Sequence, residues 1–141
     1  MAIATRTLKD TKIATGSGAA GGKVTVLVNM NDNTTADSLV VDASGLAGHA
    51  NGAKLDITRI WWALVQGTAD DNTGWASLYF VGDTDVTAIN LAGTGHYDGT
   101  AGKIENSATN TGATSGDIKL SAYGVSGYVM IELRKDESFT A

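Results

Sequence analysis

The sequence predicts an all-β protein folded as a single antiparallel β-sandwich, with the jelly roll as its candidate topology. Three observations support this fold class. Apolar and polar residues alternate at every second position in several short segments, which is typical of strands with one buried face. The chain has 18 glycines and no proline, so its turns are expected to use Gly, Asn, Asp and Thr, as β-hairpins do. No segment combines helical periodicity with capping residues.

Residues 1–22 are expected to form an extended N-terminal arm, with a short edge strand at Lys12–Thr15. The arm ends in the glycine-rich stretch Gly16–Gly22, which we interpret as a hinge before a single domain at 23–141. This stretch also matches the pattern G-x-G-x-x-G, but a dinucleotide site requires a helix directly after the glycines. A β-branched strand follows instead, so we interpret the stretch as a linker.

The first strands of the domain are short and separated by polar turns. Lys23–Met30 alternates cleanly, with its valines on one face. Asn31–Asn33 is predicted to form a turn, and Ser38–Asp42 a second short strand. A loop rich in Gly and Ala is expected at Ala43–Asn51.

The most distinctive strand is Lys54–Val65, which contains the adjacent residues Trp61 and Trp62. Neighbouring side chains on a strand point to opposite faces, so one tryptophan is expected in the core. The other must be covered by a second layer, a loop or another molecule. We place Ile60, Trp62 and Leu64 on one face, and Leu55, Ile57, Trp61, Ala63 and Val65 on the other.

The remaining strands complete the predicted sandwich. Trp75–Val81 is expected to pair with the tryptophan strand as a hairpin, and Val86–Leu91 is a weaker strand. Gly93–Gly116 is long, polar and glycine-rich, which predicts an ordered surface loop. Asp117–Ala122 and Gly127–Lys135 alternate again and form the last two strands.

Composition excludes several classes of function. The 141 residues fit one domain and carry a formal net charge of -5, and the ten basic residues are scattered, with neighbours only at Arg134 and Lys135. This distribution argues against binding nucleic acid. The absence of cysteine excludes disulfides, Cys-type zinc sites and a Cys nucleophile. No apolar run has the length of a membrane span, and the N-terminus lacks a secretion signal core, so we expect synthesis in the cytoplasm.

Candidate chemical sites are few. His96 lies near Asp98 in a loop, but a hydrolase would also need a nucleophile and an oxyanion site, so a structural or contact role is favoured. Asp70–Asn72 and Asp83–Asp85 contain calcium-type oxygen ligands, although their spacing differs from an EF-hand and solvated turns are favoured. We therefore expect no catalytic residue, no metal and no cofactor. Aromatic residues with the capacity to stack on sugars are instead assigned to a core and an interface: Trp61, Trp62, Trp75, Tyr79 and Phe80.

Four stretches between Ile57 and Lys135 carry a family resemblance. They are Arg59–Trp62, Leu78–Asp85, Gly93–Asp98, and Gly112–Leu120 followed at a fixed interval by Tyr128–Lys135. This part of the chain, a little over half of it, resembles small virion structural proteins of tailed bacteriophages, including cyanophages, of the head-decoration or cement kind. The sequence departs from that group at Phe80–Gly82, where a Trp-Asp pair is expected.

The resemblance implies a compact β-sandwich that sits on the capsid shell of a virion and binds the major capsid protein as a homo-oligomer, a dimer or a trimer. Contacts are expected from the arm and from the aromatic strands. The residues assigned to them are Ile3, Arg6, Leu8, Ile13, Trp61, Trp62, Trp75, His96 and Tyr97. Alternatives are another virion component, such as a tail, neck or fibre-associated protein, a carbohydrate-binding module, and a hydrolase built on His96 and Asp98.

Overall fold

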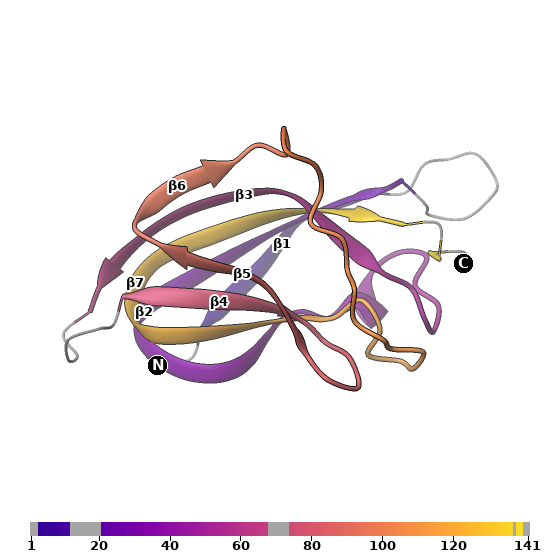
Figure 1. Ribbon diagram of the computed structural model, residues 1–141, viewed down its shortest axis with the longest axis horizontal. Helices are drawn as coiled ribbons and strands as arrows, with labels where there is room; N and C mark the ends of the chain where they lie inside the picture. Colours follow the sequence, from indigo (N-terminus) through magenta and orange to yellow (C-terminus); the bar gives the residue numbers. More distant parts are fainter. Residues whose placement is uncertain (1–2, 12–20, 68–73, 137, 140–141) are drawn as a thin grey trace.

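The computed structural model describes residues 3–11, 21–67, 74–136 and 138–139. In these residues the chain forms seven strands, all paired antiparallel, one short 3-10 helix and no α-helix (Figure 1). The elements are β1 (Ala4–Asp10), β2 (Lys23–Val41), η1 (Ala43–Gly45), β3 (Leu55–Gln66), β4 (Trp75–Phe80), β5 (Val86–Ala92), β6 (Thr94–Tyr97) and β7 (Ile118–Lys135). The predicted all-β antiparallel class is confirmed, whereas the β-sandwich arrangement and the jelly-roll topology stay predictions.

Two long central strands, β2 and β7, pair with each other over almost their whole length. Each of them joins two segments that the sequence predicts as separate strands. The turn residues between those segments bend the strands instead of reversing the chain. The pairing register shifts between Met30 and Asn33, Asp32 has a positive φ of 51°, and Gly124 opposite this region has a φ of 56°. Bulges of this kind bend a strand and increase its twist while the ladder continues on either side.

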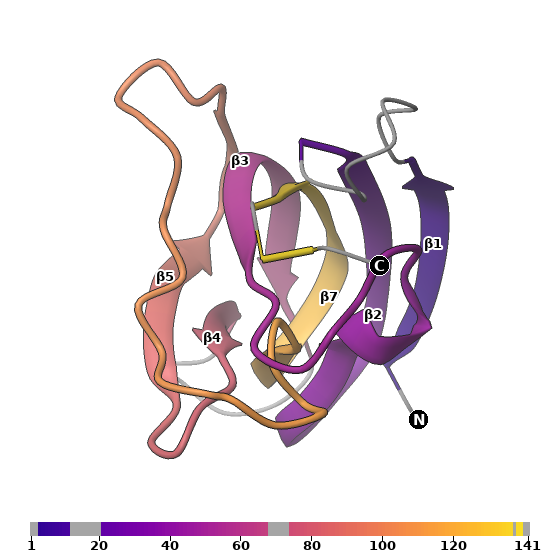
Figure 2. The same cartoon turned by 90° about the vertical axis from the view of Figure 1, so that its right-hand side faces the viewer.

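The bend divides one continuous sheet into two halves. The C-terminal half of β7 pairs with β3, which pairs with β6, and the N-terminal half of β7 pairs with β4, which pairs with β5. Figures 1 and 2 show that the two halves face each other across the interior. The predicted hairpin between the tryptophan strand and Trp75–Val81 is therefore wrong, because β3 and β4 are both neighbours of β7 and lie in different halves.

The core lies between the inner faces of the two halves. Side chains from β2, β3, β4 and β7 fill it, together with Leu91 of β5 and Phe139. Most of these residues are less than 2% exposed, including Val24, Val26 and Val28, as their alternation predicts. The larger fully buried side chains include Leu55, Ile57, Ile60, Leu78, Phe80, Ile118, Leu120, Ile131 and Leu133.

A β-bulge at Thr58 corrects the predicted faces of β3. Ile57 lies opposite Leu133 and Arg59 lies opposite Glu132, so one extra residue is inserted between them. The bulge shifts the alternation by one position, which turns Leu55 and Ile57 to the same face as Ile60, into the core. The prediction that Leu55 and Ile57 share a face with Trp61 is therefore wrong.

The N-terminal residues contribute a strand to the sheet. β1 pairs with β2 from Val24 to Asn29 and forms one edge of the sheet, with all seven of its residues exposed. The sequence places these residues in an extended arm, and the structure shows them hydrogen-bonded along the first half of β2. The predicted edge strand at Lys12–Thr15 lies outside the described residues.

A buried lysine connects β1 to the end of the chain. Lys135 is 0% exposed, and its ammonium group donates hydrogen bonds to the carboxylate of Asp10 and to the carbonyl oxygens of Thr11 and Ala47, at 2.9 and 2.7 Å. It also lies 5.7 Å from the ring centroid of Phe139. The second carboxylate oxygen of Asp10 accepts a bond from the N–H of Ala47. This network ties β1, β7 and the loop after η1 together.

Candidate binding face of the sheet

The outer face of the β1–β2–β7–β3–β6 half carries a row of apolar residues. Trp61 lies opposite His96 on β6 and opposite Met130 on β7. Met130 in turn lies opposite Leu27 on β2, and Leu27 lies opposite Arg6 on β1. Because residues opposite one another on neighbouring strands share a face, these five side chains form one continuous row across the sheet.

A second row extends the apolar surface. Ala63 on β3 lies opposite Tyr128 on β7, and Val65 lies two residues further along β3 on the same face. Tyr128 is 37% exposed and Val65 is 64% exposed. We call the surface formed by Trp61, Met130, Leu27, Ala63, Tyr128 and Val65 the apolar band.

Trp61 and Trp62 point to opposite faces of β3, as their adjacent positions predict. Trp61 is half-buried on the outer face, and its ring stacks on that of His96, with the ring centroids 5.1 Å apart and the planes at 11°. Trp62 packs against the core, and its Nε1–H donates a bond of 2.9 Å to the carbonyl oxygen of Ala92. Gly95, opposite Trp62, leaves space for the ring, because a Cβ there would lie 2.4 Å from it.

The other predicted contact residues are distributed over several surfaces. Trp75 lies in the second half of the sheet, where its ring stacks on Tyr123 at 4.0 Å between centroids. Ile3 and Tyr97 are half-buried and pack against the core, and the Tyr97 hydroxyl donates to the carbonyl oxygen of Gly102. Leu8 is 49% exposed at a bulge in β1, and Ile13 lies outside the described residues. The fold thus brings together Arg6, Trp61 and His96 on one face, and separates them from Trp75.

Histidine, serine and aspartate also meet at His49, Ser115 and Asp117, a combination that can support nucleophilic catalysis. His49 Nε2 lies 2.9 Å from the carbonyl oxygen of Ser115 and 3.4 Å from its hydroxyl. A carbonyl only accepts, so Nε2 carries the proton and is not a base toward this hydroxyl. Ser115 is 1% exposed and accepts a bond from the N–H of Gly52. The cluster therefore fixes one loop against another.

Several polar groups of the remaining candidate sites are engaged within the chain. Asp98 accepts a bond from the N–H of Thr100, and hydrogen bonding to Thr100 lowers the pKa of Asp98, while the ring of His96 stacks on Trp61. Asp85 pairs with Lys119 at 3.6 Å. In the described ranges no three His, Asp or Glu side chains are grouped to hold a metal ion. The predicted acidic turn Asp70–Asn72 lies outside those ranges.

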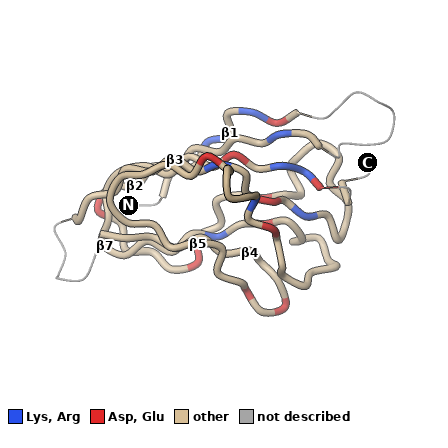
Figure 3. The backbone as a smooth tube through the Cα atoms, turned by 45° about the horizontal axis from the view of Figure 1, so that its top comes forward, with Lys and Arg blue, Asp and Glu red and all other residues tan. Residues whose placement is uncertain are grey.

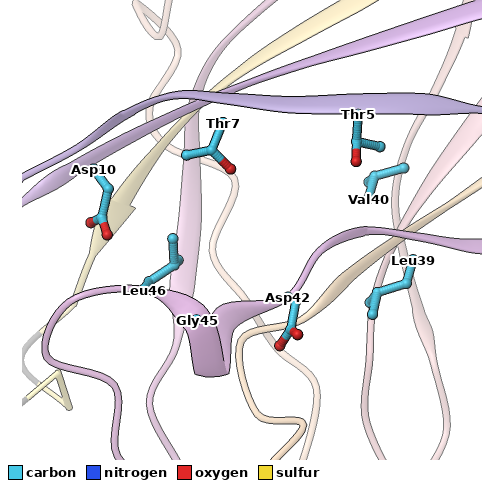
Figure 4. Close-up of a pocket in the computed structure, with 8 residues that line it drawn as sticks. All are labelled: Thr5, Thr7, Asp10, Leu39, Val40, Asp42, Gly45 and Leu46. Carbon is cyan, nitrogen blue, oxygen red and sulfur yellow. The ribbon is translucent and has the colours of Figure 1, made fainter.

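A pocket of about 320 Å³ opens between β1 and the end of β2 (Figure 4). Its two carboxylates belong to Asp10, which holds Lys135, and to Asp42, which caps η1 by accepting from Ser44. Both acids are thus already used to hold the fold. The pocket is lined by Thr5, Thr7, Asp10, Leu39, Val40, Asp42, Gly45 and Leu46.

Asp117 is expected to make stability depend on pH. Burial raises the pKa of its carboxyl, and the hydrogen bond from the N–H of Ala43 opposes the shift only in part. The folded chain therefore binds this proton more tightly than the unfolded chain. The contribution of Asp117 to the free energy of unfolding is fully present below the unfolded pKa of about 4 and falls as pH rises through the raised pKa. Asp117→Asn keeps an acceptor for Ala43 and is expected to remove this decline, measured by urea unfolding at a series of pH values. An unchanged pH profile would contradict the assignment.

Comparisons with protein-family models, with curated proteins and with solved structures find no significant match for this chain. None of the described segments is a helix long and apolar enough to cross a membrane. The function is therefore inferred from the geometry of the outer faces and from the resemblance carried by the four stretches.

Proposed function

We propose that this chain is a structural protein of a tailed-phage virion, which decorates the capsid and stabilises it by binding the major capsid protein. The observation that carries the proposal is the apolar band, which includes Trp61, on the outer face of a sheet whose inner face is well packed. The resemblance of 57–135 to decoration proteins supports the same function.

The composition of this face suits adhesion to another protein. Trp, Tyr, Met and Arg are enriched in protein interfaces, and all four types occur in or beside the band. A sheet held by a continuous core presents such residues without a large ordering cost, because the backbone is fixed before the partner arrives. Several copies on symmetric capsid sites would form the expected dimer or trimer.

The alternative functions use different features. A carbohydrate-binding module presents open aromatic ring faces, but Trp61 and Trp75 each stack on a ring of their own chain, which favours the protein-binding function. A tail, neck or fibre-associated role would use the same band against a different virion protein. A hydrolase built on His96 and Asp98 gains no support from their separate contacts.

The test is to purify phage particles from infected cells that produce the chain, and to look for the chain in those particles by cryo-electron microscopy. Trp61→Ala is expected to stay folded and to bind stripped capsids at least about tenfold more weakly, since tryptophan is enriched among the residues that contribute about 2 kcal/mol or more to an interface. The matched control is Leu39→Ala, which removes an exposed side chain near the pocket and should bind normally. Density on the tail would support the alternative virion role, and absence from particles would refute the proposal.

A further inference from the structure

Half of the basic residues of the chain gather on the outer face that carries the apolar band. These residues are scattered along the sequence, but the strand register places them side by side on neighbouring strands. Arg134 lies opposite Lys23, and in the neighbouring row Arg59, Glu132, Thr25 and Lys9 follow one another across four strands. Five of the ten Lys and Arg residues are thus on one face: Arg6, Lys9, Lys23, Arg59 and Arg134. We call them the basic group, and Figure 3 shows the blue segments on adjacent strands.

Most of these cations are not neutralised by the acids that the structure describes. The acids aligned with them, Glu132 and Asp56, are engaged: Glu132 with Lys23 at 3.7 Å, and Asp56 with Lys103 at 3.1 Å. In the part of the chain that the structure describes, Arg6, Lys9, Arg59 and Arg134 form no ion pair. Within the described ranges, a chain with a formal net charge of -5 thus has four cations without an ion pair on one side of the sheet.

The basic group and the apolar band are parts of one surface. Arg6 ends the row that contains Trp61, Met130 and Leu27, and Arg59 precedes Trp61 by two residues on the same face. Apolar residues bordered by charges resemble the core and rim of a protein interface. Cations at the rim select a partner with complementary potential and accelerate its encounter.

We propose that this face docks an acidic protein surface, with carboxylates paired to the basic group and an apolar side chain resting on the band. The proposal deepens the proposed function and rests on it only for the identity of the partner, which would then be an acidic patch on the capsid shell. Nucleic acid is the less suitable occupant. The net charge of the chain is negative, and the Trp61 ring already stacks on His96, whereas single-stranded binders offer free rings to bases.

The experiment uses the full chain and two labelled probes, poly-L-glutamate and a random copolymer of Glu and Tyr, in fluorescence anisotropy at low salt. Both are expected to bind, and binding should fall steeply toward about 0.5 M salt, where the Debye length is only a few Å. Arg59→Glu and Arg134→Glu are expected to weaken binding of both probes roughly tenfold or more. The matched control is Lys119→Glu, the same charge change in the other half of the sheet, with less than about twofold effect expected.

The Trp61→Ala variant tests the contribution of the apolar band to binding. The copolymer should bind the wild-type chain more tightly than poly-L-glutamate does, because its Tyr side chains can rest on the apolar band. This difference in affinity should disappear in the Trp61→Ala variant. Thermal unfolding of each variant checks that the fold persists.

The proposal is overturned if neither probe binds at low salt, or if Lys119→Glu weakens binding as much as Arg59→Glu does. It is also overturned if the Trp61→Ala variant still binds the Glu-Tyr copolymer more tightly than poly-L-glutamate, or if a DNA duplex binds more tightly than the acidic probes. These outcomes do not depend on whether the chain occurs in virions. Failure of the docking proposal can therefore be distinguished from failure of the proposed virion function.

Discussion

Asp10→Ala is expected to lower the free energy of unfolding by about 3–5 kcal/mol, because it removes the carboxylate partner of a fully buried ammonium group. Lys135 is 0% exposed, and without Asp10 its described partners would be two backbone carbonyls and the ring of Phe139, none of which carries a negative charge. The same change also removes the acceptor for the N–H of Ala47. Equilibrium denaturation in urea measures the loss.

A matched control lies in the same pocket. Asp42 is also an aspartate that lines it, and its side chain accepts hydrogen bonds from Ser44, at the start of η1. Asp42→Ala is expected to cost about 1 kcal/mol, as for loss of a capping residue. A double-mutant cycle of Asp10→Ala with Lys135→Met would isolate the pair, since Met fills similar volume without charge. Equal losses for Asp10→Ala and Asp42→Ala would show that the ion pair of Asp10 with the buried Lys135 contributes little.

Gly127→Ala is expected to be at least as disruptive, with a loss of about 4 kcal/mol or more. A Cβ at this position would lie 1.9 Å from the carbonyl oxygen of Ala63, which belongs to the backbone of the neighbouring strand β3. The backbone also has a φ of 129°, which side-chain-bearing residues rarely adopt. Relief would require β3 and β7 to separate where their register places Leu64 opposite Gly127. Thermal unfolding and the yield of soluble protein are the measurements.

Substitution of Gly102 distinguishes the cost of backbone strain from the cost of the steric contact with Ala63. It also has a positive φ, 112°, but a Cβ there would meet nothing within 4 Å. Gly102→Ala therefore reports backbone strain alone, expected to cost about 1–2 kcal/mol. If the two variants lost equal stability, the contact with Ala63 would not be the reason for glycine at 127.

Much of the fold follows from local pattern. Alternation identified the buried faces of Lys23–Met30 and Gly127–Lys135, and it placed Trp61 and Trp62 on opposite sides of their strand. Side-chain alternation depends only on the extended backbone, so it can be read without knowing any partner. It failed at Leu55 and Ile57, because the bulge at Thr58 forms only when β3 aligns with β7.

The sequence predicted less well which strands pair with one another. The turn-forming residues of Asn31–Asn33 predicted a chain reversal, but in the structure they bend β2 while it continues beside β7. The same bend divides β7 between β3 and β4, which sequence neighbours alone would have joined as a hairpin. β6 was predicted as part of a loop, because its four residues become a strand only beside β3.

The sequence predicted the residues of the candidate binding face only in part. Arg6, Trp61 and His96 were assigned to contacts separately, and the structure places them in one row. Lys9, Lys23, Arg59 and Arg134 were regarded as scattered charges, although their outward positions on alternating strands were a usable signal.

The sequence by itself determined an all-β chain with alternating buried faces and a tryptophan on each side of one strand, since these properties depend on residues close together in the chain. Only the tertiary structure decided which strands are neighbours, and therefore that five cations and an apolar band share one surface. The physical reason is that register between distant strands is set by packing of the whole core and by bulges at a few positions, which no local segment specifies.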